Sequence, residues 1–76
     1  MIEIFGKPNC PNCKRAVEVV RKYNEPYEYK NIEYKMYLLE LSEKLGKLPD
    51  RVPYIFMDDF EIKSVNELEQ KLKFIN

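Results

Sequence analysis

The only two cysteines of this chain, Cys10 and Cys13, flank Pro11 and Asn12 where an apolar opening segment meets a stretch with helical periodicity. Proline suits the first position of a helix, because its missing N–H would be unpaired there in any case. A thiol at this first turn faces unpaired backbone N–H groups and the positive end of the helix dipole, which both favour the thiolate. The motif therefore predicts a strand-to-helix junction with a reactive sulfur at Cys10 and a reversible disulfide to Cys13.

The length and the charge of the chain limit what it can be. Its 76 residues allow one domain, residues 1–76, and 45% apolar residues are enough for a single compact core. Thirteen basic and thirteen acidic side chains cancel. Charge therefore favours neither nucleic acid nor an anionic membrane surface as a partner.

The sequence also bears on the compartment. No apolar run approaches the roughly 18 residues of a membrane span, and no signal-peptide pattern follows Met1, so we expect a cytoplasmic protein without a membrane partner. In that reducing compartment a lone cysteine pair is more often catalytic or metal-binding than a permanent crosslink. A structural disulfide is therefore the weaker interpretation.

The first half of the chain reads as strand, helix, strand, helix. Residues 1–5 form an apolar run typical of a buried strand, and residues 11–23 follow helical spacing with an inner face of Cys13, Ala16, Val17 and Val20. Residues 27–32 alternate with period two, as a strand does. A second helix is expected over residues 34–45, with Gly46 at its C-terminal cap and an inner face of Leu38, Leu41 and Leu45.

The second half reads as a hairpin followed by a helix. Residues 52–57 resemble a strand with Pro53 near its start, and Asp58-Asp59 can turn the chain into a strand over residues 60–62. Ser64 and Glu67 fit the capping box of a last helix with an inner face of Val65, Leu68, Leu72 and Ile75. The order β-α-β-α-β-β-α predicts an α/β fold with a four-stranded mixed sheet flanked by helices. Its first two strands should be parallel, and the hairpin should extend the sheet past the first strand.

Taken together, these features resemble the glutaredoxins, short members of the thioredoxin superfamily, over essentially the full length. Three pieces match in order: the Cys-Pro-x-Cys box after the first strand, Val52-Pro53 opening the third strand, and the run from Ile55 through Ile62 to Leu68. The length, and the loop between Gly46 and Val52, resemble the small phage and bacterial members. The resemblance implies a thioredoxin-like fold.

The chain departs from the family pattern at three places. Asn12 stands where members usually carry Tyr, and Arg51 stands where Thr usually precedes the Val-Pro pair. Lys63-Ser64 replaces the Gly-Gly that the family places beside its glutathione site. The first two changes leave the thiol chemistry intact, whereas the third bears on glutathione affinity.

The two cysteines are expected to have different roles. As a thiolate, Cys10 attacks a target disulfide to form a mixed disulfide, which Cys13, one helical turn later, resolves. Cys13 falls on the apolar face of its helix, so it should be more buried and keep a higher pKa than Cys10. Lys7 and Lys14 are candidates for added positive charge near Cys10. The resemblance favours Lys7, because members carry a basic residue shortly before the first cysteine.

The resemblance also implies a glutathione and substrate site beside the cysteines. Pro53 resembles the family's cis-proline, which lets the backbone of the preceding residue, here Val52, pair with a bound peptide or glutathione strand. The start of the last helix would hold the γ-glutamyl end of glutathione, unless Ser64 simply caps that helix and nothing binds. Tyr54 is the one tyrosine placed to contact a partner, and the others are expected to pack. The predicted binding residues are Lys7, Pro11, Asn12, Arg51, Val52, Pro53, Val65 and Asn66.

The leading hypothesis is a monomeric dithiol oxidoreductase that reduces protein disulfides or glutathione mixed disulfides with electrons from glutathione and without a metal. The resemblance makes ribonucleotide reductase a candidate client. Because the Gly-Gly pair is missing, an alternative function stays open: a redoxin that is reduced by thioredoxin reductase instead of glutathione.

A Cu(I) carrier is an alternative from another class, because such carriers also place a CxxC motif after their first strand. Such carriers run β-α-β-β-α-β with Met before the first cysteine, where this chain has Asn9. A zinc site is also disfavoured, because tetrahedral zinc needs four ligands and the chain has only two thiols and no histidine.

Overall fold

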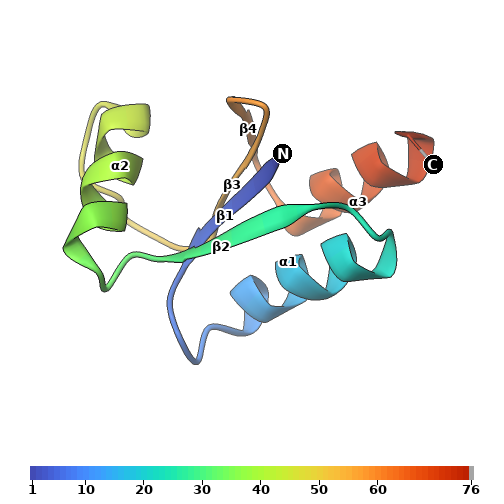
Figure 1. Cartoon of the computed structure of the whole chain (residues 1–76), viewed down its shortest axis with the longest axis horizontal. Helices are drawn as coiled ribbons and strands as arrows, with labels where there is room; N and C mark the ends of the chain where they lie inside the picture. Colours follow the sequence, from blue (N-terminus) through green and yellow to red (C-terminus); the bar gives the residue numbers. More distant parts are fainter. Residues whose placement is uncertain (76) are drawn as a thin grey trace.

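The computed structural model of the chain describes residues 1–75, and Ile75 by its backbone alone. Within these residues the elements follow the expected order: β1 (Ile2–Gly6), α1 (Pro11–Lys22), β2 (Tyr27–Asn31), α2 (Lys35–Leu45), β3 (Tyr54–Met57), β4 (Phe60–Ile62) and α3 (Val65–Ile75). The sheet order is β2-β1-β3-β4, with β1 parallel to β2 and antiparallel to β3 (Figure 1). This confirms the mixed sheet and the place of the hairpin.

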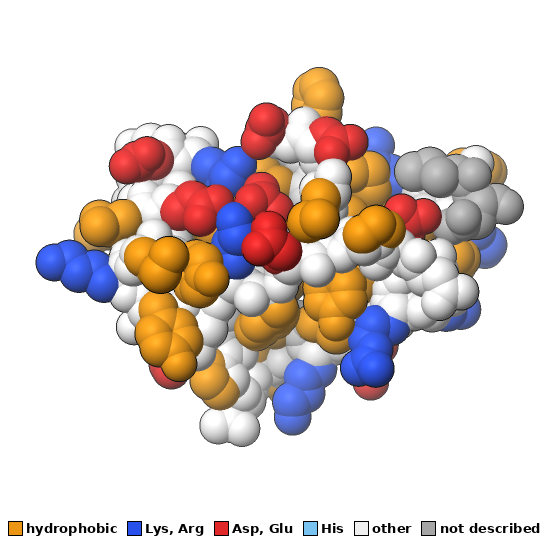
Figure 2. Space-filling view, viewed as in Figure 1, with side chains coloured by type: hydrophobic (Ala, Val, Ile, Leu, Met, Phe, Trp, Pro, Cys, Tyr) orange, Lys and Arg blue, Asp and Glu red, His pale blue; other side chains and the backbone are white. Residues whose placement is uncertain are grey.

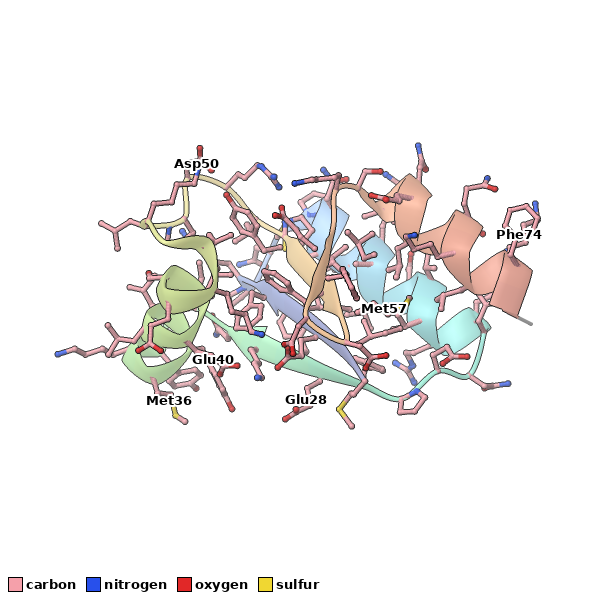
Figure 3. All side chains as sticks on the ribbon, turned by 90° about the horizontal axis from the view of Figure 1, so that it is seen from above. Glu28, Met36, Glu40, Asp50, Met57 and Phe74 are labelled. Carbon is pink, nitrogen blue, oxygen red and sulfur yellow. A yellow bond between two sulfur atoms is a disulfide. The ribbon has the colours of Figure 1, made fainter. Side chains whose placement is uncertain are left out.

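The sheet separates two apolar clusters, as the alternation of side chains along its strands requires. Ile4 of β1 faces α1 and α3, whereas its neighbour Phe5 faces α2, and both are fully buried. Seen from above, α2 lies on one side of the sheet and the other two helices lie on the opposite side (Figure 3). The larger cluster, on the side of α1 and α3, comprises Ile2, Ile4, Ala16, Val20, Ile55, Ile62, Val65, Leu68 and Leu72.

The contact between α2 and the sheet is partly ionic. Lys30 of β2 is 7% exposed, and its Nζ lies 2.6 Å from a carboxylate oxygen of Glu3 and 2.6 Å from one of Glu40. Burial alone raises the pKa of Glu3, but the hydrogen bonds and charges of Lys30 and Lys44 outweigh it, so this pKa lies below its ordinary value. Acidic and basic side chains mix over the sheet in Figure 2. On α2, the apolar side chains of Met36 and Leu39 are exposed.

Several ends of the elements differ slightly from the sequence prediction. β3 begins at Tyr54 rather than at residue 52, in keeping with Pro53, which has no N–H to give to a sheet. α2 begins at Lys35, one residue later than predicted, with Tyr34 as its N-cap. Gly46 ends this helix in the left-handed conformation at φ 71°, as expected of a glycine cap.

The cap of α3 is a variant of the predicted capping box. The Ser64 hydroxyl accepts a hydrogen bond from the Glu67 N–H at 3.0 Å, as predicted. The Glu67 carboxylate accepts one from the N–H of Lys63 at 2.6 Å, one residue before the expected donor. Val65, Leu68 and Leu72 are buried as predicted, while the predicted burial of Ile75 lies outside the described side chains. Among the described residues, no helix combines the length and apolarity needed to cross a membrane.

Candidate active site

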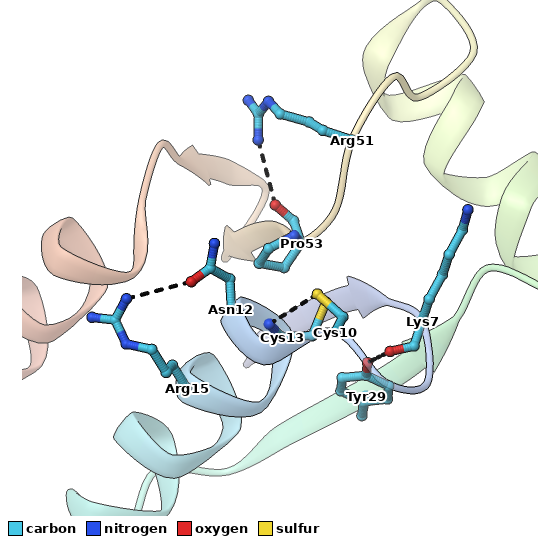
Figure 4. The surroundings of a disulfide bond; sticks show 8 residues. All are labelled: Lys7, Cys10, Asn12, Cys13, Arg15, Tyr29, Arg51 and Pro53. Carbon is cyan, nitrogen blue, oxygen red and sulfur yellow. Dashed lines mark hydrogen bonds between the residues drawn. A yellow bond between two sulfur atoms is a disulfide. The ribbon is translucent and has the colours of Figure 1, made fainter.

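Cys10 is the N-cap of α1, immediately before Pro11 at the first helical position. Its sulfur is bonded to that of Cys13, with the two Cα atoms 5.2 Å apart. The backbone N–H of Cys13 donates a hydrogen bond to Sγ of Cys10 at 3.2 Å (Figure 4). The helix thus directs the Cys13 N–H and the positive end of its dipole at this sulfur, which favours a thiolate there once the disulfide is reduced.

The two sulfurs have unequal access to solvent. The Cys13 side chain is 1% exposed and lies against β1, whereas Cys10 is only half-buried. The expected difference in burial is confirmed. Cys10 is therefore the more accessible of the two cysteines to a molecule arriving from solvent.

The loop before β3 brings Pro53 close to the N-terminal turn of α1. The peptide bond between Val52 and Pro53 is cis, as the resemblance implied. Pro53 and Asn12 line the same cavity (Figure 4). Val52 lies two residues before the start of β3 and lines this cavity together with Pro53 and Asn12.

The cavity has a volume of about 250 Å³ and lies between α1, the loop before β3 and the start of α3. Six of the eight predicted binding residues line it: Asn12, Arg51, Val52, Pro53, Val65 and Asn66. Arg15, Lys63 and Ser64 complete its polar lining. Arg51 and Lys63 are partly neutralised by Glu61, whose carboxylate lies 3.8 Å and 3.3 Å from them.

The other two predicted binding residues lie elsewhere. Pro11 is exposed on the first turn of α1, next to Cys10. The side chain of Lys7 extends away from the disulfide in Figure 4, towards a hollow that also contains Ile32 and Leu38. Lys14, the second candidate for added charge, lines a further hollow with Lys7 on the side of β2.

Tyr54 is a core residue. It is 3% exposed, and its hydroxyl donates to the Asp50 carboxylate at 2.7 Å. This hydrogen bond lowers the pKa of Asp50 and raises that of Tyr54. The Arg51 guanidinium lies 4.4 Å from the centre of the Tyr54 ring. Tyr54 therefore shapes the cavity only indirectly, by holding the loop that carries Arg51.

Sequence reasoning did not assign Arg15 to this site. Its Nη1 donates to the Asn12 side-chain oxygen at 3.4 Å, three positions earlier on the same helix. That spacing places both residues on one face of α1, so the sequence alone could have predicted that Arg15 lies beside Asn12. Lys63 and Ser64 were noted as departures from the family pattern, and the structure places both on the cavity wall.

Comparison with known proteins agrees with this geometry. The glutaredoxin family model matches residues 2–62. A glutaredoxin of Haemophilus influenzae is 33% identical over 78 residues, covering 95% of this chain and 90% of that protein. Glutaredoxin 1 of Escherichia coli is 35% identical over 65 residues, covering 78% of this chain and 76% of the relative.

Solved structures extend the match to the fold. The structure of reduced Escherichia coli glutaredoxin superposes with a TM-score of 0.73 at 30% identity, covering 96% of this chain and 93% of the other. A thioredoxin-like protein, BC3987, superposes with a TM-score of 0.76 at 19% identity and shares the fold. The chain has the thioredoxin-like fold and belongs to the glutaredoxin family of thiol-disulfide oxidoreductases.

Proposed function

We propose that this protein is a dithiol glutaredoxin that reduces protein disulfides and glutathione mixed disulfides, with Cys10 as the nucleophile and Cys13 as the resolving cysteine. One observation supports these roles above all. The half-buried Cys10 sulfur receives the Cys13 N–H at 3.2 Å at the start of α1, whereas the Cys13 sulfur is buried behind it. A helix N-terminus that stabilises a thiolate and access to solvent therefore coincide at one sulfur.

The reaction follows from these positions. The Cys10 thiolate attacks one sulfur of a client disulfide, and the electron pair leaves on the other client sulfur, which takes a proton from water. Cys13 then loses its proton and attacks Cys10, releasing the second client sulfur as a thiol. The client gains two electrons and two protons, and the enzyme is left with the Cys10–Cys13 disulfide. Two glutathione molecules return it to the dithiol and become oxidised glutathione.

The cavity beside the disulfide suits glutathione by charge. Glutathione carries two carboxylates, and Arg15, Arg51 and Lys63 line the cavity. The backbone N–H groups of Val65 and Asn66 at the start of α3, with the Asn66 side chain, offer a second place for a carboxylate. Val52 lines the same cavity, and its backbone would pair with the peptide part of the ligand. Lys63-Ser64 replaces glycines at this wall, and we propose that Lys63 supplies a cation where the family offers close backbone approach.

The remaining parts of the proposal follow the family. The protein works as a monomer of one domain in the reducing cytoplasm, without a metal cofactor. Its clients are proteins with accessible disulfides, among which we include ribonucleotide reductase. Charge complementarity supports glutathione as the electron donor, and recharging by thioredoxin reductase is the competing candidate.

A coupled reductase assay tests this proposal. The full chain is supplied with NADPH and either glutathione plus glutathione reductase or thioredoxin reductase alone. Turnover of a glutathionylated peptide is then followed by NADPH oxidation. We expect turnover with the glutathione system only, none for Cys10→Ser, and retained turnover for Cys13→Ser, because a glutathione mixed disulfide needs only one thiol. Full activity of Cys10→Ser would refute the assignment of the nucleophile, and turnover with thioredoxin reductase alone would refute the electron donor.

A further inference from the structure

Gly6 ends β1 at a place where three parts of the chain meet too closely for a side chain. A Cβ at this position would lie 2.5 Å from the hydroxyl oxygen of Tyr29 and 2.8 Å from Sγ of Cys13. Both distances are well below the 3.5–4.0 Å at which carbon atoms make favourable contacts. The Tyr29 hydroxyl and the Cys13 sulfur therefore border the same small space beside Gly6.

The Tyr29 hydroxyl is fixed in this position. It donates a hydrogen bond at 2.9 Å to the carbonyl oxygen of Lys7, in the loop that leads to Cys10. Figure 4 shows the hydroxyl beside the cysteine pair, where β2 meets this loop. A tyrosine hydroxyl is protonated at neutral pH, and partial burial raises the pKa of Tyr29 further, so the hydroxyl can donate this bond.

Tyr29 also stands between the sulfur and open solvent. A hollow of about 400 Å³ is bounded by Tyr29 together with Lys7, Pro8, Asn9, Lys14, Val17 and Glu18. Cys13 is not among the described residues that line it, and its side chain is 1% exposed. The Tyr29 hydroxyl therefore separates the Cys13 sulfur from this hollow.

We propose that Tyr29 is a positioning residue for the resolving sulfur. Its hydroxyl and the backbone of Gly6 restrict the directions that lead away from Cys10, so the Cys13 side chain keeps the rotamer from which its sulfur reaches Cys10. This inference rests on the proposed function, in which Cys13 closes the ring. It concerns the closure step and not the attack of Cys10 on a disulfide.

In the step that Tyr29 assists, the sulfur of Cys13 displaces glutathione from Cys10. Cys13 gives its proton to water, and its thiolate attacks Sγ of Cys10 in the mixed disulfide with glutathione. The Cys10–Cys13 bond forms, the bond to glutathione breaks, and the departing glutathione sulfur takes a proton from water. A side chain free among three staggered rotamers would hold the productive one about a third of the time. Confinement to that rotamer therefore increases the rate of closure by up to about threefold.

The test measures closure and attack separately. Tyr29→Phe removes only the hydroxyl. Tyr27→Phe is the matched control, because Tyr27 is on the same strand and face but pairs with Ile2 at the far end of β1. The reduced full chain is mixed with oxidised glutathione and quenched with acid at intervals. Mass spectrometry then gives the amounts of glutathionylated and internally bridged protein with time. Tyr29→Phe and Tyr27→Phe are also made in a Cys13→Ser variant, in which the ring cannot close. The rate of glutathionylation there measures the attack of Cys10 alone.

We expect Tyr29→Phe to slow closure about two- to threefold and to leave attack by Cys10 unchanged, with Tyr27→Phe altering neither rate. Gly6→Ala, whose methyl group would press on both the sulfur and the hydroxyl, should slow closure further. Closure of Tyr29→Phe at the wild-type rate, or equal slowing of attack and closure, would overturn the role of Tyr29. Failure of the wild-type protein to become glutathionylated at Cys10 would instead refute the proposed function itself.

Discussion

Replacement of Lys30 by methionine should destabilise the protein far more than the loss of an ordinary surface charge. Lys30 makes two ion pairs at 2.6 Å, to Glu3 and Glu40, and its side chain is 9% exposed. The Lys30 Nζ also lies over the rings of Phe5 and Tyr37, and methionine keeps an unbranched apolar side chain there without the charge. The substitution therefore removes the charge and leaves two carboxylates close together under α2.

The magnitude follows from how far the partners are buried. Removing one partner of a fully buried ion pair costs about 3–5 kcal/mol. The side chains of Glu3 and Glu40 are 19% and 37% exposed, and Lys44 still lies 3.4 Å from Glu3. Both carboxylates therefore keep some water or a second cation, and we expect a loss of about 2–3 kcal/mol. For a domain of this size that corresponds to a fall of roughly 10–20 °C in Tm.

Thermal and urea unfolding followed by circular dichroism measure this loss. Lys22→Met is the matched control, because Lys22 pairs with Glu69 at 3.2 Å while its side chain is 64% exposed. We expect the control to leave Tm essentially unchanged. A loss below about 1 kcal/mol for Lys30→Met, or equal losses for the two variants, would contradict the argument that the buried ion pairs hold α2 on the sheet.

Three further results are expected. Ser64→Ala should lower the free energy of unfolding by about 1 kcal/mol in urea titrations, because the Glu67 N–H loses its capping oxygen, and an unchanged midpoint would count against the cap. Because the folded state lowers the pKa of Glu3 below 4.5, its contribution is present above that pH and is lost as the pH falls through the lowered pKa. Acid unfolding should show this loss in the wild type and less of it in Lys30→Met, and identical acid profiles would refute it. Arg51→Gln should raise the KM for a glutathionylated peptide about two- to fivefold with little change in kcat, whereas Lys47→Gln, outside the cavity, should not.

Much of the fold could be predicted from the sequence because its signals are local. Pro11 at the first helical position, Gly46 in a left-handed cap and Ser64 at the start of α3 each act within a few residues, and all three are observed. The period-two pattern over residues 27–32 identified β2 correctly. It did not reveal that Lys30 is buried, because its partners Glu3 and Glu40 lie on other elements, β1 and α2, and meet it only in the folded chain.

The candidate site shows the same division. The cysteine motif and Pro53 could be located because their spacing and order are distinctive, and the structure brings the regions around them together. Lys7 was grouped with the binding residues by its position before Cys10, but the loop directs its side chain the other way. The approach of Tyr29 to Cys13 depends on the register of β1 against β2, which places Ile4 opposite Tyr29. Such a register is set by packing and cannot be read from either strand alone.

The central claim is that the start of α1 holds Cys10 as a thiolate near neutral pH, and the pH dependence of alkylation tests it most directly. The reduced protein is treated with iodoacetamide over a range of pH values, and mass spectrometry of peptides gives the modification rate at each cysteine. We expect the midpoint for Cys10 to lie clearly below that of a free thiol, about 8.5, with Cys13 modified more slowly throughout. A midpoint for Cys10 equal to that of a free thiol, or faster modification of Cys13, would contradict the account.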